Sequence, residues 1–433
     1  MATALAHPSA VEAGASAALR ERLAARYDEV RGFTDSLTEG LAAEDMVVQS
    51  MADVSPTKWH LAHTSWFFET FVLLPNLDGY RPLDAAYAYL FNSYYVQAGE
   101  RHCRAQRGYI SRPTVAEVRA YRRHVDAAIR TLLERLPEDR LAELEPLLTL
   151  GLHHEQQHQE LMLTDIKHVF SVNPLRPVYR AAEAPRAGAA PAAAWVDFPE
   201  GLHWVGWAGP GFAYDNEGPR HREFVEPFAL ASRLVTNGEY LEFMADGGYR
   251  RPELWLSMGW ATREQNDWTE PFYWERRDGD WWLFTLSGMH PVEPAEPVCH
   301  LSYFEADAFA RWAGARLPTE FEWEVAAAGL PAAGNFVEDR AYHPLAAARG
   351  AGLLQMYGDV WEWTRSQYTP YPGFQPAAGA VGEYNGKFMC NQFVLRGGSC
   401  ATSVSHIRPT YRNFFPPDAC WQFTGVRLAR DLR

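Results

Sequence analysis

Hydrophobic residues in the first 170 positions recur with the spacing of amphipathic helices. Four stretches place apolar side chains at i, i+3, i+4 and i+7, namely residues 17–33, 55–73, 114–136 and 142–170. Ser55 and Pro56 can act as N-cap and first helical residue of the second stretch, and Pro113 stands just before the third. Four long helices joined by loops predict an up-and-down bundle.

The pattern changes in the second part of the chain, where helical periodicity nearly disappears and Gly, Pro and Trp separate short apolar runs. Two helices still stand out there, one over 303–314 and one that begins after Thr319, a good N-cap. The low-complexity Ala/Pro run at 181–194 predicts a linker. We therefore expect an α+β multidomain chain, with a helical domain over 17–180 and a mixed α/β domain over 195–433.

Charge and composition argue against several classes of function. The 433 residues carry 40 Lys and Arg against 54 Asp and Glu, a net charge of −14, and general binding to nucleic acids or membrane surfaces needs a basic face. No stretch approaches the ~18 apolar residues of a membrane-spanning helix, and polar residues interrupt the Ala-rich N-terminus, so no secretory segment is expected. The five cysteines include no CxxC pair, which argues against a disulfide framework or a zinc ribbon. We expect a cytoplasmic protein without nucleic-acid or membrane partners.

The sharpest chemical signal is the segment from His154 to His158, HEQQH, within the fourth expected helix. Residues at i and i+4 lie on one helical face with Cβ atoms about 5–6 Å apart, so two imidazoles at this spacing can bind one metal ion. A third ligand is expected from another helix of the bundle, and both His60 and His63 are candidates. Three neutral imidazoles leave coordination positions open and suit iron(II) or zinc. The segment also meets the literal HExxH pattern, which leaves a zinc hydrolase as an alternative.

A second cluster lies in the longest loop, at about residues 75–112, where a connection of this length is often functional. It carries the adjacent Tyr94 and Tyr95 and, close behind them, arginines at positions 101, 104 and 107. Arginine side chains clasp carboxylates in a bidentate manner, so the loop could hold an amino-acid or peptide substrate. The alternative is a solvated loop whose arginines pair with surface acids.

A third cluster lies near the C-terminus, at residues 408–430. Asn413 offers a hydrogen-bond donor and an acceptor, and Phe414, Phe415 and Trp421 offer aromatic faces. Aromatic faces attract quaternary ammonium groups through cation–π interaction. The alternative is that these rings are part of the core of a loop-rich domain.

Several segments of the second part resemble the sulfatase-modifying-factor, or formylglycine-generating-enzyme-like, domain, which has a C-type-lectin-like fold. They are PVCHLSYFEADAFARWAGARLPTEFEWEVAAAG (297–329), GDVWEWT (358–364), VLRGGSC (394–400) and GVRLAR (425–430). The first part, with HEQQHQELMLTDI (154–166), resembles a DinB-like four-helix domain. This pairing of domains is similar to the ergothioneine-biosynthesis sulfoxide synthases, and it covers nearly the whole chain.

The resemblance implies roles for individual residues. The family's iron ligands fall on His63, His154 and His158. The other assignments are Gln157 for the substrate imidazole, Asn413 for the betaine, Phe414 and Phe415 for its trimethylammonium group, and Arg104 and Arg107 for a carboxylate.

Two branches of the family differ in where the catalytic tyrosine stands. The Tyr94 and Tyr95 pair, in the metal-bearing domain, resembles the branch that is associated with cysteine rather than γ-glutamylcysteine, and we expect the catalytic residue in this pair. In the other branch the tyrosine follows the WEW motif, where Tyr368 or Tyr371 could take its place. Cys400 stands alone near the RGGS segment, so the sulfatase-activating chemistry of the formylglycine-generating enzymes is not expected.

The resemblance implies a non-haem iron(II) enzyme that uses O2 to join the imidazole C2 of hercynine (trimethylhistidine) to the sulfur of cysteine or γ-glutamylcysteine, with sulfoxidation. These small molecules are its expected partners. One alternative is an ovothiol-type synthase that acts on histidine, although no glycine-rich SAM-binding stretch is present. Another is a non-catalytic lectin-like binding protein.

Overall fold

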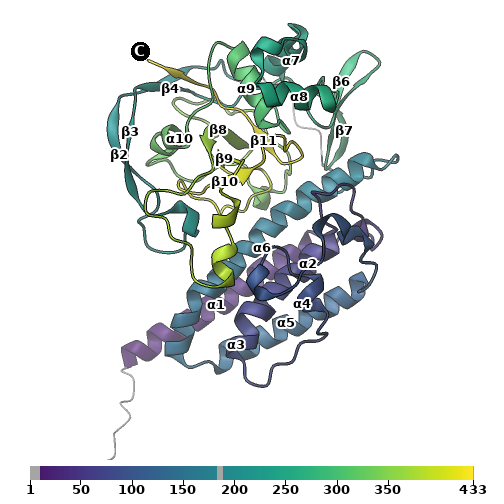
Figure 1. Cartoon of the computed structure of the whole chain (residues 1–433), viewed down its shortest axis with the longest axis vertical. Helices are drawn as coiled ribbons and strands as arrows, with labels where there is room; N and C mark the ends of the chain where they lie inside the picture. The colour runs from purple at the N-terminus through teal and green to yellow at the C-terminus, as the bar shows by residue number, and fades with distance from the viewer. Residues whose placement is uncertain (1–9, 183–188, 433) are drawn as a thin grey trace, which may run out of the picture. The chain divides into compact units, whose positions relative to one another are not determined.

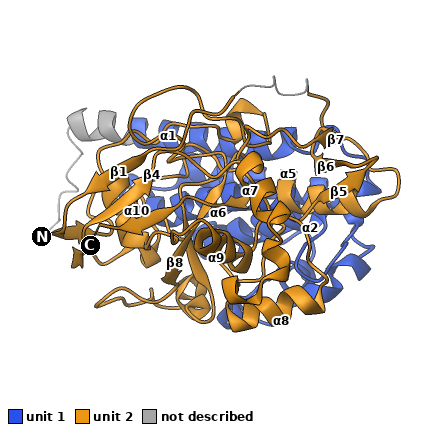
Figure 2. Ribbon diagram, turned by 90° about the horizontal axis from the view of Figure 1, so that it is seen from above, with its two compact units in different colours: residues 1–162 blue, residues 163–433 orange. Residues whose placement is uncertain are grey.

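The computed structural model describes residues 10–182 and 189–432, with side chains from residue 18 on (Figure 1). The chain divides into two compact units, residues 1–162 and 163–433 (Figure 2). This division falls inside the longest helix, whereas the domain limits expected from the sequence flank the Ala/Pro run, so those limits stay predictions. Part of that run, 183–188, lies outside the described residues.

The first unit is built from the long helices that the periodicity predicts. They are α1 (Ala10–Ser36), α2 (Thr57–Phe67), α5 (Val115–Arg135) and α6 (Glu138–Val172), the last of which continues into the second unit. α2 runs on as a π-helix, η2 (Phe68–Leu73). Shorter helical segments are η1 (Asp45–Val47), α3 (Leu74–Asn76), α4 (Tyr87–Leu90), η3 (Val96–Ala98) and η4 (Arg104–Tyr109).

A capping box marks the start of α5, and α2 is buried along its whole length. Thr114 Oγ1 accepts a hydrogen bond from the Glu117 N–H (3.2 Å), and the Glu117 carboxylate accepts one from the Thr114 N–H (2.7 Å), a capping box that satisfies two amides at the start of α5. Every residue of α2 is buried, its histidines included. The polar side chains of α2 therefore need partners inside the unit, because a buried polar group without a hydrogen bond is costly.

The described part of the second unit contains four small sheets. The first joins β1 (Trp195–Phe198), β4 (Phe228–Ala231) and β12 (Ala429–Asp431). The second orders β10 (Asn413–Phe415), β9 (Phe393–Arg396), β8 (Trp361–Gln367) and β11 (Thr424–Gly425), and only its β8–β11 pair is parallel. The others are the hairpin of β2 (Gly201–Val205) with β3 (His221–Val225), and the meander of β5 (Trp274–Arg277), β6 (Asp280–Thr285) and β7 (Gly288–Pro291).

Helices complete this unit. The α-helices are α7 (Asn237–Ala245), α8 (Ser257–Gln265), α9 (Tyr303–Trp312) and α10 (Glu320–Ala327). Short 3-10 segments are η5 (Asp215–Glu217), η6 (Gly248–Arg250), η7 (Pro252–Leu254), η8 (Val337–Asp339), η9 (Ala380–Glu383) and η10 (Gly386–Phe388). Both helices expected from the sequence are confirmed, and Thr319 caps α10 by accepting a hydrogen bond from the Glu322 N–H (3.0 Å). In the described part of the chain, no helix combines the length and the apolar character that crossing a membrane requires.

Candidate metal centre

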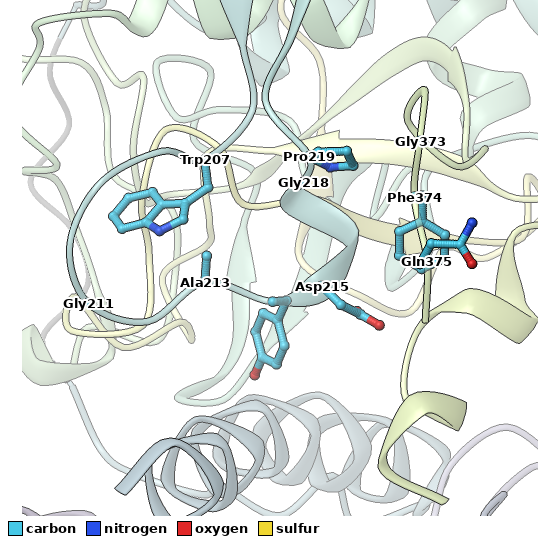
Figure 3. Close-up of a pocket in the computed structure, with 10 residues that line it drawn as sticks. Trp207, Gly211, Ala213, Asp215, Gly218, Pro219, Gly373, Phe374 and Gln375 are labelled. Carbon is cyan, nitrogen blue, oxygen red and sulfur yellow. The ribbon is translucent and has the colours of Figure 1, made fainter. Parts of the chain in front are cut away.

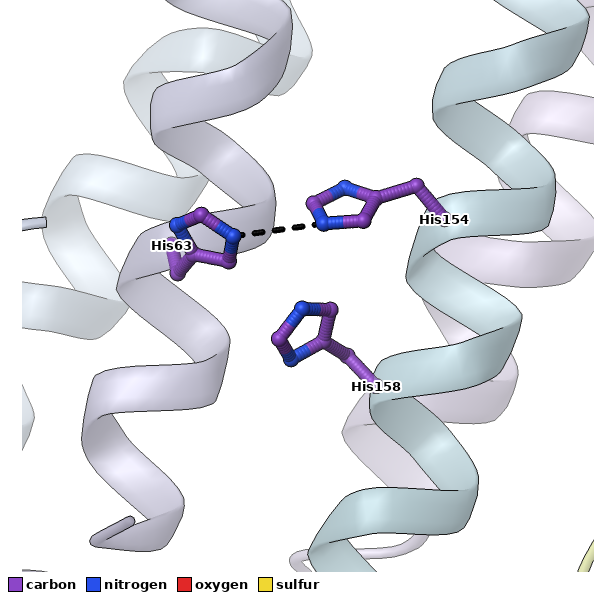
Figure 4. Close-up of side chains that lie close together, drawn as sticks. All are labelled: His63, His154 and His158. Carbon is purple, nitrogen blue, oxygen red and sulfur yellow. Dashed lines mark hydrogen bonds between the residues drawn. The ribbon is translucent and has the colours of Figure 1, made fainter. Parts of the chain in front are cut away.

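Three histidine side chains from two helices of the first unit converge on one point (Figure 4). His63 comes from α2, and His154 and His158 come from consecutive turns of α6. One ring nitrogen of each lies within 4.8 Å of the others, and the Nε2 atoms of His63 and His154 are 3.2 Å apart. All three side chains are buried. The i, i+4 spacing on α6 thus places two imidazoles beside a third from α2.

Hydrogen bonds at Nδ1, the ring nitrogen that does not face the common point, orient the rings of His63 and His158. Nδ1 of His63 is 2.6 Å from the Phe91 carbonyl oxygen, to which it donates, so that Nε2 carries the lone pair. Nδ1 of His158 is 2.8 Å from Nδ1 of His60, which leaves Nε2 of His158 facing the other two histidines. Lone pairs that face each other favour a cation between them, and a set of three imidazoles fits iron(II) or zinc.

Burial keeps the three imidazoles neutral. It lowers the pKa of His154 to about 3, and it lowers the pKa values of His63 and His158 well below their ordinary range, with a further contribution from the neighbouring histidines. The neutral imidazole is the form that binds a metal ion. Protons therefore do not compete for these nitrogens near neutral pH.

Glu155 follows His154 directly, but its side chain binds a different set of partners. Its carboxylate accepts hydrogen bonds from Arg31 (2.8 Å), Arg122 (2.6 Å) and Thr34 (2.7 Å). Although burial alone would raise the pKa of Glu155, the two arginines lower it to about 2. A carboxylate held in this way does not act as a general base. The HExxH pattern therefore lacks here the function that it has in zinc hydrolases.

Aromatic rings enclose the His63 imidazole on two sides. Trp59 stacks on it with 4.6 Å between the ring centroids, and Trp66 stacks on it with 5.4 Å. The three residues lie four and three positions apart, so they share one face of α2. Trp59, His63 and Trp66 thus form a column of stacked rings, and this column fixes the plane of the His63 ring.

The two arginines expected to bind a carboxylate lie in different surroundings. Arg107 is buried, its guanidinium lies 3.3 Å from the centre of the Trp59 ring, and it donates hydrogen bonds to the hydroxyls of Ser55 (2.9 Å) and Ser93 (3.2 Å). Arg104 is exposed and donates to a backbone carbonyl. Through Trp59, Arg107 thus contacts the column that holds a histidine of the metal centre, whereas Arg104 faces solvent.

The Tyr94 and Tyr95 pair borders the same column. Tyr95 is fully buried, with 5.5 Å between its ring centroid and that of Trp66, and Tyr94 stacks on Tyr95 at 4.6 Å. The two hydroxyl oxygens are 3.5 Å apart. In the second unit, by contrast, an amide binds the hydroxyl of Tyr368, and the hydroxyl of Tyr371 donates to a carboxylate. The choice of Tyr94 and Tyr95 as the catalytic pair stays a prediction.

The remaining expected substrate residues are divided between the two units. Gln157 lies on α6, next to a histidine of the metal centre, and is half-buried. Asn413, Phe414 and Phe415 form β10 in the second unit and are also half-buried. The ring of Phe414 stacks on that of Tyr368 with 4.1 Å between the centroids. Their roles toward a substrate stay predictions.

Sequence reasoning missed the arginines that hold Glu155. Arg122 had a signal of its own, since it interrupts the apolar stripe of α5 between Val118 and Val125. A charged residue inside such a stripe requires a buried partner. Nothing in the local pattern of α1 or α5 indicates that the partner of Arg31 and Arg122 stands on α6.

Comparison with known families agrees with the two-part architecture. The DinB superfamily matches residues 26–162, and the family described as "Sulfatase-modifying factor enzyme 1-like domain" matches 181–346 and 340–432. The protein is therefore of the class that joins a DinB-type helical domain to a domain of the formylglycine-generating-enzyme type, with its C-type-lectin-like fold.

Relatives that match along most of their length show to which family within this class the chain belongs. A protein named hercynine oxygenase from Mycolicibacterium thermoresistibile is 36% identical over 88% of this chain and 88% of its own. The hercynine oxygenase of Mycobacterium tuberculosis is 33% identical over 95% of this chain and 99% of its own. The formylglycine-generating enzyme of the same organism is 28% identical but matches only 50% of this chain. The chain belongs to the hercynine oxygenase family, a family of enzymes, which confirms the resemblance to the ergothioneine-biosynthesis sulfoxide synthases.

Proposed function

We propose that this chain is a non-haem iron(II) enzyme that uses O2 to join the imidazole C2 of hercynine to the sulfur of cysteine or γ-glutamylcysteine, with sulfoxidation, in ergothioneine biosynthesis. The observation that carries the proposal is the convergence of His63, His154 and His158 as three buried imidazoles. It is supported by relatives named hercynine oxygenase that match most of the chain.

The donor set is suited to a catalytic ion. Structural sites are normally closed by four protein ligands, whereas three ligands leave positions open for reactants. When bound, iron(II) supplies redox chemistry and these open positions. The protein holds the imidazoles in place through the Phe91 carbonyl, the His60 ring and the two stacked indoles of α2.

The proposed substrate contacts would bring the reacting atoms side by side. The amide of Gln157 would bind the hercynine imidazole, and the β10 residues Asn413–Phe415 would hold its betaine end. Arg104 and Arg107 would clasp the carboxylate of the thiol substrate. Such alignment can lower a reaction barrier by several kcal/mol, up to ~7–11 kcal/mol for near-ideal geometry.

Tyr94 or Tyr95 would provide the proton that the reduction of O2 consumes. Their hydroxyls lie 3.5 Å apart, and the Tyr95 ring packs on Trp66, which in turn stacks on His63. A positioned phenol of this kind is a general acid. Proton delivery at the right moment directs the reaction toward the conjugate rather than toward simple oxidation of the thiol.

The test is a reconstitution assay. The protein is loaded with Fe(II) without oxygen and then given hercynine, O2 and either cysteine or γ-glutamylcysteine, while O2 consumption and product mass are followed together. We expect a conjugate sulfoxide with one of the two thiols, and His154→Ala should abolish it. No O2 uptake by protein with confirmed iron would overturn the proposal, and uptake without conjugate would reduce it to a thiol oxidase.

Substituting histidine for hercynine in the same assay tests the ovothiol-type alternative. The proposed enzyme should turn over hercynine faster than histidine, and proton NMR of the product should show that sulfur is attached at C2 of the ring. A preference for histidine, with sulfur at C5, would replace the proposed substrate by the unmethylated one.

A further inference from the structure

The hairpin of β2 and β3 carries apolar side chains on its exposed face. Helix α10 contacts both strands, and in the described part of the chain no third strand pairs with either of them (Figure 1). The register sets Leu202 opposite Phe224 and Trp204 opposite Arg222. Leu202, Trp204 and Phe224 are 62%, 59% and 53% exposed. These three side chains therefore form one apolar patch on the outer face of the hairpin.

The polarity of the two faces is the reverse of the usual one. Successive side chains of a strand point to opposite faces, and a sheet with one solvated face normally has polar residues there. In this hairpin the half-buried face carries His203, His221 and Glu223, and the ring of His221 lies 5.8 Å from that of Phe321 on α10. The outer face is thus the more apolar of the two, which indicates an interaction surface.

The loop between the two strands shows a different use of a nearby tryptophan. Trp207 lines an open hollow of about 450 Å³ together with Phe374 (Figure 3). Trp204 does not line this hollow, and no aromatic ring in the described part of the chain stacks on it. The guanidinium groups of Arg220 and Arg222 lie 5.5 and 6.0 Å from the centre of its ring. Trp204 thus stands among cations on the outer face.

Charges of opposite sign stand at the two ends of this hairpin. Arg220 directly precedes β3 and Arg222 lies near its start, and both are exposed without an ion pair in the described part of the chain. At the opposite end, Glu200 directly precedes β2 and Glu226 directly follows β3, and both are exposed. The outer face therefore has a basic end, an apolar centre and an acidic end, with no net charge.

This arrangement is complementary to itself. A two-fold axis that lies between two such faces, perpendicular to the strands, turns one copy end for end relative to the other, so that each basic end meets an acidic end. Nucleic acids and anionic membranes would be repelled by the glutamates as much as they are attracted by the arginines. We propose that the outer face of the β2–β3 hairpin binds the same face of a second copy of this chain.

The contacts of the proposed dimer follow from the register. With β3 of one copy reversed over β3 of the other, Arg220 of each copy faces Glu226 of its counterpart, and Trp204 packs on Leu202. The three apolar side chains expose on the order of 300 Å² per copy, less than half of a standard interface. The dimer is therefore reversible, with a Kd on the order of micromolar. The proposal is independent of the function proposed above, since it requires neither iron nor turnover.

The test is the oligomeric state of the metal-free full chain in solution. Sedimentation velocity between about 1 and 200 μM should show a monomer that converts to a dimer as the concentration rises. The ion pairs lie at the rim of the interface, so raising the salt concentration from about 0.05 to 0.5 M should weaken the dimer about 3- to 10-fold. A monomer at every concentration would overturn the proposal.

A truncation of the central ring locates the interface. Trp204→Ser should weaken the dimer at least about 10-fold, because a tryptophan at the centre of an interface contributes much of its affinity. Met258→Ser is the matched control, since Met258 lies on α8 of the same unit and is 67% exposed. Equal effects of the two substitutions, or a dimer that Trp204→Ser leaves intact, would place the interface elsewhere and refute the proposal.

Charge reversal tests the two-fold arrangement. Arg220→Glu and Glu226→Arg should each weaken the dimer about 3- to 10-fold, and the double variant should restore it. Within one copy these residues stand about 20 Å apart along the strand, too far for restoration to arise inside the chain. All three variants should keep the thermal midpoint of the unchanged protein. A double variant as weak as the single ones would show that the copies do not pair in this way.

Discussion

His60 lies three residues before His63 on α2, and its Nδ1 atom is 2.8 Å from Nδ1 of His158. If His158 binds the metal ion through Nε2, the proton of its ring stays on Nδ1 and is donated to His60. His60 is then the residue that fixes the tautomer and the plane of the His158 ring. It acts on the metal centre without touching the ion.

Replacing His60 by Phe should weaken metal binding while the fold is kept. Loss of a hydrogen bond to a ligating histidine typically costs about 10- to 100-fold in metal affinity. Co(II) titration, followed by its visible absorption, measures the change. His153→Phe is the control, because His153 adjoins His154 but is not part of the three-histidine cluster. Equal affinities of His60→Phe and the unchanged protein would show that the hydrogen bond has no such role.

The low pKa values of the three histidines predict a metal affinity that hardly depends on pH. Burial lowers these pKa values, so the rings stay unprotonated as the pH falls through 6.5, where an ordinary imidazole takes up a proton. Between pH 7.5 and 6.0 the Co(II) affinity should change less than about 3-fold, whereas three ordinary imidazoles would lose on the order of 50-fold. Calorimetric titration at both pH values decides between these outcomes.

The same shifts predict the sign of acid destabilisation. A histidine whose pKa is lowered by folding takes up a proton more readily in the unfolded chain, so the metal-free protein loses stability as the pH falls below about 6.5. Bound metal ion should raise the stability by a similar amount at each pH without removing this loss, because it binds the folded state alone and its affinity for that state hardly changes over this range.

Tyr94 and Tyr95 are distinguished by burial, since Tyr95 is fully buried and Tyr94 is only partly so. Replacing the acting tyrosine by Phe removes its proton but keeps the ring stack. We expect one of the two variants to divert turnover from the conjugate sulfoxide toward oxidation of the thiol, with O2 uptake retained. The product ratio by mass spectrometry is the measurement, and Tyr368→Phe is the comparison. Unchanged ratios in both Tyr94→Phe and Tyr95→Phe would remove the pair from the mechanism.

At the scale of secondary structure, helix α6 makes polar contacts on two of its faces. Its histidines face α2, while Glu155 is bound by Arg31 of α1 and Arg122 of α5. All three partners of this ion cluster are buried. The cluster therefore sets the rotation of α6 about its own axis, and with it the direction of the two imidazoles.

Glu155→Gln should be strongly destabilising. It leaves two buried guanidinium groups without their shared carboxylate, and breaking a buried ion pair costs about 3–5 kcal/mol. Glu145→Gln, on the same helix, removes an exposed pair with Arg22 and should cost less than about 1 kcal/mol. Urea denaturation of both variants measures the difference. Similar midpoints would mean that the cluster does not hold α6.

For the molecule as a whole, metal binding and stability are linked. A ligand that binds only the folded state at 100 times its Kd stabilises that state by about 2.7 kcal/mol. Fe(II), added without oxygen at this ratio, should raise the urea midpoint of the unchanged protein. His154→Ala should abolish the increase and His153→Ala should keep it. An increase that survives in His154→Ala would place the stabilising metal outside the three-histidine cluster.

An element of this fold can be predicted from the sequence when the interactions that form it lie within a short segment of the chain. Helices α5 and α10 could be predicted because their caps, Thr114 and Thr319, and their apolar faces are local features. Strand β11 could not, because its two residues carry no periodicity of their own and are extended only by pairing with β8, about 60 residues earlier in the chain. The same holds for β10 and β12, whose three residues each are too few for a pattern of alternation.

The sequence by itself determined which residues share a helical face, where the long helices begin and which family the motifs resemble, because caps, spacing and motifs are properties of short segments. Only the tertiary structure decided how the histidine of α2 meets the pair on α6, and why the carboxylate of HExxH binds arginines. Each of these outcomes depends on side chains from segments that are distant in the chain. Their proximity follows from the burial of helix faces and loops against one another, and no single segment encodes it.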